Sequence, residues 1–166
     1  MEDEPQTSLR AYIDSVHVEG PSTVRDQRFG GSLVFKTKVP FVAKDIARRL
    51  SLGLAFSADP DFEKKSGLVN IYQNFYTLVP FVEFDYVKLF RFGVLAGPGL
   101  ILTETKFDVL NNKETRSELS YISVLGFAID YAVSSRCELS WHALVQYRHK
   151  HKSLDWRQGL GFGFNF

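Results

Sequence analysis

The sequence predicts an all-β protein that forms a closed antiparallel transmembrane β-barrel of about eight strands. Large apolar residues alternate with small or polar residues along most of the chain, which is typical of strands whose two faces meet different surroundings. Aromatic residues make up 14% of the 166 residues, and phenylalanine alone occurs 15 times. A chain of this length suits one compact domain over residues 1–166.

The last segment, residues 156–166, shows the alternation most clearly. Its even positions are mostly large and apolar, and its odd positions are glycine, arginine or asparagine. A soluble barrel would place its large apolar face inward. Here the small face fits the crowded interior of a narrow barrel, and the aromatic face fits lipid. We therefore expect Leu160, Phe162 and Phe164 on the outer wall.

The same alternation predicts the remaining strands in chain order. The expected strands cover residues 9–18, 28–39, 47–57, 70–84, 88–104, 118–132, 136–149 and 156–166. The first is the least regular, because Leu9 and Ile13 lose phase with Val16, and a β-bulge would restore the phase. The others carry apolar residues at every second position, such as Leu50, Leu52, Leu54 and Phe56, or Leu139, Trp141, Ala143, Val145 and Tyr147.

The connections between these strands are expected to alternate in length, as they do in outer-membrane barrels. Short turns near residues 40–45, 85–87 and 134–135 would lie on the periplasmic side. Longer loops at residues 19–27, 58–67, 108–117 and 150–155 would lie on the other side.

Composition excludes several other classes of protein. A spanning helix needs about 20 predominantly apolar residues, and the longest uncharged run, residues 66–82, contains three amides and a proline. The net charge of +1 gives no reason to expect nucleic-acid binding. The single cysteine, Cys137, cannot form an internal disulfide, and no zinc-binding spacing occurs. We expect neither a metal nor a cofactor.

Two segments resemble the small outer-membrane barrels of the OmpA and opacity type: the ending Gly-Leu-Gly-Phe-Gly-Phe-Asn-Phe at residues 159–166, and the hairpin at residues 128–139. The resemblance implies a bacterial outer-membrane location and a final aromatic residue, here Phe166, that the barrel assembly machinery recognises. The other implied partners are membrane lipid and lipopolysaccharide, and the protein would be a monomer. Export would require a signal peptide that has been removed, because the start, Met-Glu-Asp-Glu-Pro, has no basic and apolar regions.

A soluble lipocalin-like barrel is the alternative fold. Such barrels usually have an early Gly-x-Trp and a helix after the last strand, and the sequence has neither.

Charged residues fall on the predicted inner face, where an unpaired charge would be costly. They are Lys36, Lys38, Arg49, Glu83, Asp85, Arg91, Asp130, Glu138, Arg148 and Arg157. An eight-stranded barrel is just wide enough for side chains to fill it. We therefore expect Glu83, Asp130 or Glu138 to pair with an inward lysine or arginine and to plug the interior. A narrow ion or water path is the alternative, because inward glycines thin the filling.

Residues 148–155, Arg-His-Lys-His-Lys-Ser-Leu-Asp, form the one chemistry-bearing cluster of the sequence. His151, Ser153 and Asp155 supply the residue types of a base, a nucleophile and an orienting acid. Extending the outward phase of the preceding strand places His151 and Ser153 on the lipid side, at the level of the outer-leaflet headgroups. In the alternative interpretation the segment is a basic loop, in which Arg148, Lys150 and Lys152 contact lipid phosphates.

The cluster is similar to the His-x-Ser motif of outer-membrane lipid A deacylases, which are also eight-stranded barrels. The resemblance implies that His151 is the base, Ser153 the nucleophile and Asp155 the nearest candidate for the acid. The chain departs from that family at Leu154, where the family has asparagine, and in the shorter loop before the acid. Our first interpretation is therefore a non-enzymatic outer-membrane protein with a structural, adhesive or lipopolysaccharide-interacting role. A lipid A deacylase-like esterase and a narrow pore are the alternatives.

Overall fold

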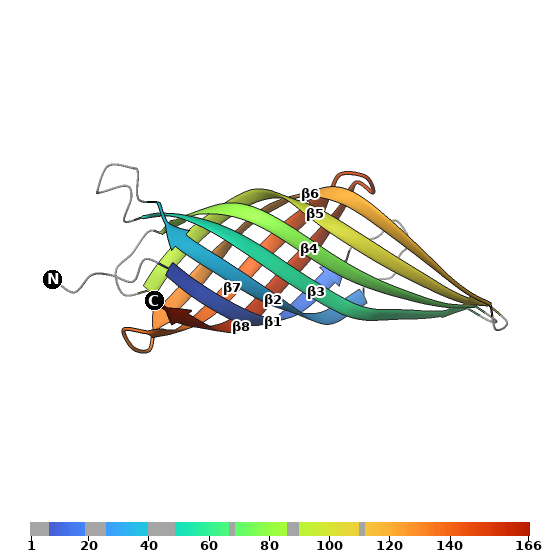
Figure 1. The fold of residues 1–166 in the computed structure, drawn as a ribbon, viewed down its shortest axis with the longest axis horizontal. Helices are drawn as coiled ribbons and strands as arrows, with labels where there is room; N and C mark the ends of the chain where they lie inside the picture. The colour runs from blue at the N-terminus through green and yellow to red at the C-terminus, as the bar shows by residue number, and fades with distance from the viewer. Residues whose placement is uncertain (1–6, 19–25, 40–48, 67–68, 86–89, 110–111) are drawn as a thin grey trace.

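The chain folds into a closed antiparallel barrel in which eight strands follow one another in sequence order (Figure 1). The structure, a computed structural model, describes residues 7–18, 26–39, 49–66, 69–85, 90–109 and 112–166. The strands are β1 (Thr7–Val18), β2 (Asp26–Lys38), β3 (Leu50–Ser66), β4 (Val69–Asp85), β5 (Phe90–Val109), β6 (Asn112–Ala132), β7 (Cys137–Arg148) and β8 (Ser153–Asn165). The predicted fold class is confirmed. Within these residues there is no helix long and apolar enough to cross a membrane.

The first and last strands close the barrel by pairing with each other. β1 pairs with β8 from Ser8↔Asn165 to Val18↔Asp155, and it pairs with β2 over its whole length without a register shift. The β-bulge expected in the first strand is therefore wrong. Val16 is 2% exposed and faces inward, so the alternation continues through it.

The outer wall carries the large apolar side chains, as predicted for the last strand. Leu160, Phe162 and Phe164 are 71%, 41% and 53% exposed. The glycines between them face the interior. A Cβ atom at Gly161 would lie 2.5 Å from the Tyr12 ring, so the narrow interior admits no larger residue there without a shift.

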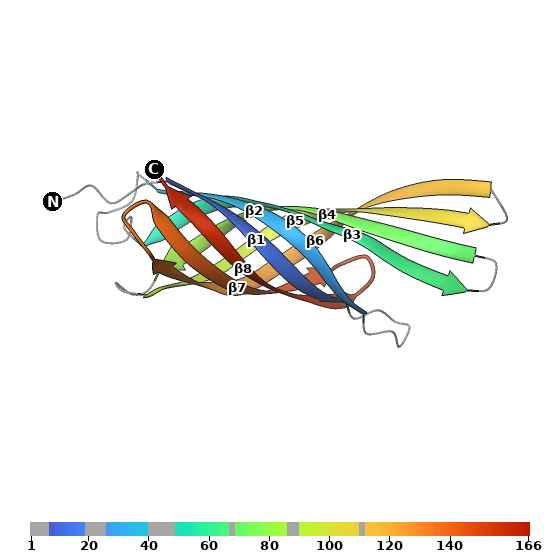
Figure 2. The same cartoon turned by 90° about the horizontal axis from the view of Figure 1, so that it is seen from below.

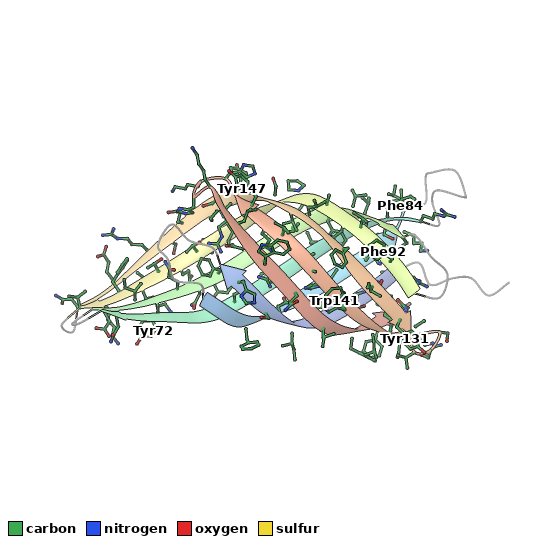
Figure 3. All side chains as sticks on the ribbon, turned by 180° about the vertical axis from the view of Figure 1, so that it is seen from behind. Tyr72, Phe84, Phe92, Tyr131, Trp141 and Tyr147 are labelled. Carbon is green, nitrogen blue, oxygen red and sulfur yellow. The ribbon has the colours of Figure 1, made fainter. Side chains whose placement is uncertain are left out.

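Aromatic residues mark the two ends of this apolar outer band. Phe84, Phe92 and Tyr131 lie near the end of the barrel that carries the C-terminus, and Tyr147 lies near the opposite end (Figures 1 and 3). We call these the basal and apical ends. Aromatic girdles of this kind flank the lipid-facing band of outer-membrane barrels, which is about 25 Å tall.

Strands β3 to β6 continue beyond the apical end of the barrel as a four-stranded sheet (Figure 2). We call this sheet the extension and define it as residues 59–66, 69–75, 103–109 and 112–118. Its strands pair out to Ser66↔Val69 and Val109↔Asn112. β2 leaves β3 at Gly31↔Ala58, and β7 leaves β6 at Ile122↔Arg148.

The long loops predicted at residues 58–67 and 108–117 are therefore wrong, because most of those residues are paired strand. The alternation of apolar residues follows the apolar outer wall of the barrel, and it stops where that wall stops. Backbone pairing continues beyond that point because it needs no apolar side chain. A register shift between Asp59 and Phe62 marks the place where β3 leaves the barrel.

Candidate functional site

A network of buried ion pairs fills the basal half of the barrel. Arg10 donates hydrogen bonds to Asp130 (Nη2···Oδ2 2.7 Å) and to Glu138. Lys36 Nζ lies 2.9 Å from Glu83 Oε1 and 3.6 Å from Asp130 Oδ2. We call these five residues the basal cluster. Their charges lie close enough to offset one another in an interior from which most solvent is excluded.

A second network lies nearer the apical end. Arg157 donates hydrogen bonds to Asp14 (Nη1···Oδ2 2.7 Å) and to Asp59. Arg148 donates to Asp155. We call these five residues the apical cluster. His142 joins it through Nε2, which lies 3.0 Å from Asp14 Oδ1.

The prediction that Glu83, Asp130 or Glu138 pairs with an inward lysine or arginine is confirmed by the Lys36–Glu83 pair. One predicted inward residue is wrong: Arg49 is exposed, because it precedes β3 and lies in a turn where strand alternation does not apply. Sequence reasoning missed Arg10, Asp14 and Asp59 as interior charges. Continuing the alternation of β1 through Val16 would have found the first two.

The β7–β8 turn contains the predicted catalytic cluster, and the structure separates its members. His151 Nε2 lies 3.1 Å from Glu118 Oε1 at the base of the extension, and Lys150 Nζ lies 3.1 Å from the same oxygen. The hydrogen bond from Lys150 holds the pKa of Glu118 below its ordinary value. In the described residues no hydrogen bond joins His151 to Ser153.

Ser153 and Asp155 share the inward phase of β8. Ser153 begins the strand opposite Arg148, and Asp155 is 0% exposed and accepts a hydrogen bond from Arg148 inside the barrel. The expected lipid-side position of Ser153 is therefore wrong, because the turn at residues 149–152 resets the phase between the two strands. Catalysis by His151, Ser153 and Asp155 stays a prediction.

Two of the three predicted phosphate-binding residues lie on the surface. Lys150 and Lys152 are exposed in the turn, and Lys152 has a left-handed backbone with φ of 50°. Arg148 instead faces the interior, where its guanidinium lies 4.5 Å from the centroid of the Phe75 ring. His149, which precedes Lys150, lies on the outer surface with its Nε2 atom 2.8 Å from Ser123 Oγ.

In the described part of the chain, no group of three or more His, Cys, Asp or Glu side chains is placed so that it could hold a metal ion.

Searches against family models and against curated proteins return no match. Solved structures do match over nearly the whole chain. Ail, the attachment invasion locus protein of Yersinia pestis, aligns with a TM-score of 0.72 at 15% identity, covering 99% of this chain and 100% of that one. Neisserial surface protein A aligns with a TM-score of 0.71 at 12% identity, covering 96% and 97%.

A major outer membrane protein from Thermus thermophilus aligns with a TM-score of 0.69 at 11% identity, covering 96% of this chain and 99% of that one. Identities this low show the fold alone. The resemblance expected from the ending and the hairpin is confirmed at that level: the chain has the fold of the eight-stranded outer-membrane β-barrels.

Proposed function

We propose that the chain is a bacterial outer-membrane protein, exported with a signal peptide that is then removed, and that its role at the cell surface is binding rather than catalysis. The apolar outer band between two aromatic ends supports the location, because lipid is the surrounding that such a wall matches. The basal end would face the periplasm and the extension would face the outside.

The observation that carries a binding role is the extension. Strands that only span the membrane need about 9–11 residues each, whereas β5 and β6 have 20 and 21. The additional length builds a sheet that stands clear of the barrel, with β4 and β5 in its middle (Figure 2). A paired sheet presents side chains in fixed positions, so it loses little conformational freedom when it binds.

The outer face of the extension has the composition of a recognition surface. By strand alternation, Asn70, Tyr72 and Asn74 of β4 lie on the face opposite the inward Phe75, and Figure 3 shows Tyr72 on the extension. Tyrosine and asparagine are enriched in antibody binding loops, because a rigid ring gives contact area and an amide gives adaptable hydrogen bonds. Opposite charges, Glu104 and Lys106, lie beside them on β5.

Of the structural, adhesive and lipopolysaccharide-interacting roles, these features favour the adhesive one, in which the extension binds an external surface. Ail is named for attachment and invasion, and Neisserial surface protein A is named for its place at the surface. Their names support the proposal by likeness of fold. An interaction of Lys150 and Lys152 with lipopolysaccharide phosphates is compatible with it, because both lysines are exposed at the apical end of the outer wall.

Orientation is tested by cysteine labelling in intact cells. In a Cys137→Ser background, Lys113→Cys places a thiol in the extension and Arg136→Cys places one in the exposed basal turn. A membrane-impermeant maleimide should label the first in intact cells and label the second only after the outer membrane is opened. The reverse pattern would contradict the proposed orientation.

Adhesion is tested with bacteria that display either the full chain or a shortened chain in which tight turns replace the extension. The full chain should raise adherence to epithelial monolayers at least tenfold over the shortened one, with both barrels folded equally by heat-modifiable migration on gels. Tyr72→Ala should reduce adherence, and Ser117→Ala, an exposed residue at the edge strand β6, is the matched control. Equal adherence by the full and the shortened chains would contradict an adhesive role for the extension. Lipopolysaccharide binding that the shortened chain retains would then favour the lipopolysaccharide-interacting role.

The esterase alternative is tested separately by incubating the refolded protein with lipid A in detergent and following its mass. We expect no change, because Leu154 and the short turn remove two parts of the deacylase arrangement, and losing one oxyanion donor can cost about 100- to 1000-fold in rate. A known deacylase is the positive control. Loss of an acyl chain that disappears on Ser153→Ala or His151→Ala would establish the enzyme instead.

A further inference from the structure

The barrel interior contains a cavity between the basal and apical clusters. Its volume is about 40 Å³ when measured as the space open to the centre of a water molecule. The two clusters lie on opposite sides of it along β1 and β7. On β1 the inward residues run from Arg10 through Tyr12 to Asp14, and on β7 they run from Glu138 to Arg148.

The wall of this cavity is largely apolar. Six buried or half-buried side chains form what we call the middle layer: Val34, Val79, Phe81, Leu95, Val124 and Leu144. Phe81 fills the space beside Gly53, where a Cβ atom would lie 2.1 Å from its ring. Polar side chains also line the cavity, among them Ser57, Thr77 and Gln146 and the rings of Tyr12 and His142, whose centroids lie 4.2 Å apart, but most of the surface open to the cavity is apolar.

Polar atoms that need water lie on both sides of the middle layer. On the basal side, Ser8 Oγ and Ser51 Oγ are buried without a hydrogen-bond partner in the described residues. They line a small pocket of about 10 Å³ by the same measure, which is close to the space for one water. On the apical side, Arg157 Nε is likewise buried without a hydrogen-bond partner there. Polar atoms able to hydrogen-bond water therefore lie at both ends of the interior, and the middle layer lies between them; in the cavity wall itself, His142 Nε2 is also without a hydrogen-bond partner in the described residues.

We propose that the middle layer is the seal that prevents ions from crossing the barrel, and that the ion-pair clusters are not. Hydrophobic constrictions close pores by excluding water, whereas charged side chains line the paths that ions take. An ion that reached either cluster would find carboxylates and guanidinium groups able to replace part of its hydration shell. In the middle layer it would meet valine, leucine and phenylalanine, which replace none of it.

The seal rests on the proposed membrane location of the barrel but not on the adhesive role of the extension. Wetting the middle layer should open the barrel to ions, and breaking an ion pair should not. Three of its residues, Val34, Val79 and Val124, can be tested by exchange for threonine, which has nearly the same shape and adds a hydroxyl group.

The experiment measures conductance of planar bilayers that contain the purified full chain. The wild-type protein should stay near background, and the triple variant Val34→Thr, Val79→Thr and Val124→Thr should raise the ion current at least tenfold. The matched control exchanges outward valines, Val82→Thr and Val94→Thr, and should leave the current unchanged. Glu138→Gln, which removes a carboxylate from the basal cluster, should also leave it unchanged.

Current through the Glu138→Gln protein at the level of the triple variant would overturn the proposal, and so would a triple variant that stays at background. Large, steady steps from the wild-type protein would overturn it as well, because no seal would then exist. Folding of each variant is checked by heat-modifiable migration. If the triple variant does not fold, Val124→Thr alone should still raise the current, by a smaller factor, and its failure to do so counts against the proposal.

Discussion

Replacement of Arg157 by methionine should lower the free energy of unfolding by about 3–4 kcal/mol, in the lower part of the range of about 3–5 kcal/mol for removing one partner of a buried ion pair. Arg157 is 2% exposed, and its Nη1 atom lies 2.7 Å from Asp14 Oδ2. At that distance the attraction between unit charges is about 6 kcal/mol at an effective dielectric constant of about 20. Desolvation of the ions opposes it by several kcal/mol.

The lower part of the range applies because Asp14 keeps a second partner. His142 Nε2 stays 3.0 Å from its other carboxylate oxygen, and Ser32 donates it a hydrogen bond. Asp59 loses its contact with Arg157. Methionine fills much of the volume of arginine, so the loss reports charge more than packing. Adding Asp14→Asn and Asp59→Asn to Arg157→Met should recover more than half of the lost stability.

The assay is urea unfolding in phospholipid vesicles, followed by the fluorescence of the two tryptophans. Gln158→Met is the matched control, because Gln158 is the next residue of β8 and is exposed on the outer face. It should not lower the stability, because it places a more apolar side chain on the outer face. A loss below about 1 kcal/mol for Arg157→Met would refute the reasoning, because one lost neutral hydrogen bond would account for it.

Three further perturbations test other parts of the structure. Gly53→Ala should cost about 1–3 kcal/mol in the same assay, because its Cβ atom would lie 2.1 Å from the Phe81 ring, and Phe81→Leu in that background should restore part of the loss. Leu160→Arg should cost about 2–4 kcal/mol in vesicles if the outer wall faces lipid, and an unchanged stability would count against that placement. Glu118 lies in the extension beyond the apolar band, and its pKa is lowered in the folded protein. Its pair with Lys150 therefore stabilises the turn above the ordinary glutamate pKa of about 4.3, and this stabilisation, under about 1 kcal/mol for an exposed contact, is lost as pH falls through the lowered value. The amides of the β7–β8 turn should lose protection from exchange, relative to their intrinsic rates, as the wild-type protein is acidified; Glu118→Gln should remove this loss, and a wild-type protein that shows none would contradict the pair.

The alternation of residues predicted the barrel well where the chain contacts an apolar surrounding. The outward positions of Leu160, Phe162 and Phe164 follow directly from it, and β8 begins within three residues of its expected start. Most of the extension could not be predicted in the same way. The expected strand at residues 70–84 reaches into it, but a segment such as residues 112–118 is polar on both faces, so no periodic signal distinguishes it from a loop.

The site was harder to predict than the fold, because facing inward does not determine a partner. Arg10 contacts Asp130 across 120 positions of sequence, and only the tilt and stagger of the strands bring them to one level. The catalytic hypothesis depended on a phase carried from β7 through the turn to Ser153. A turn of four residues resets that phase, and Asp155 then points into the barrel.

Closure of the barrel by β1 and β8 has a consequence for how the protein is made. Ser8 cannot reach its partner Asn165 until nearly the whole chain is present. The ion pair between Arg10 and Glu138 likewise joins positions 128 residues apart. Until then one edge of β1 has unpaired N–H and C=O groups, which are a template for pairing with the wrong chain. Folding through contacts this distant in sequence is slow, so a variant that delays closure should aggregate more than the wild-type chain while it folds.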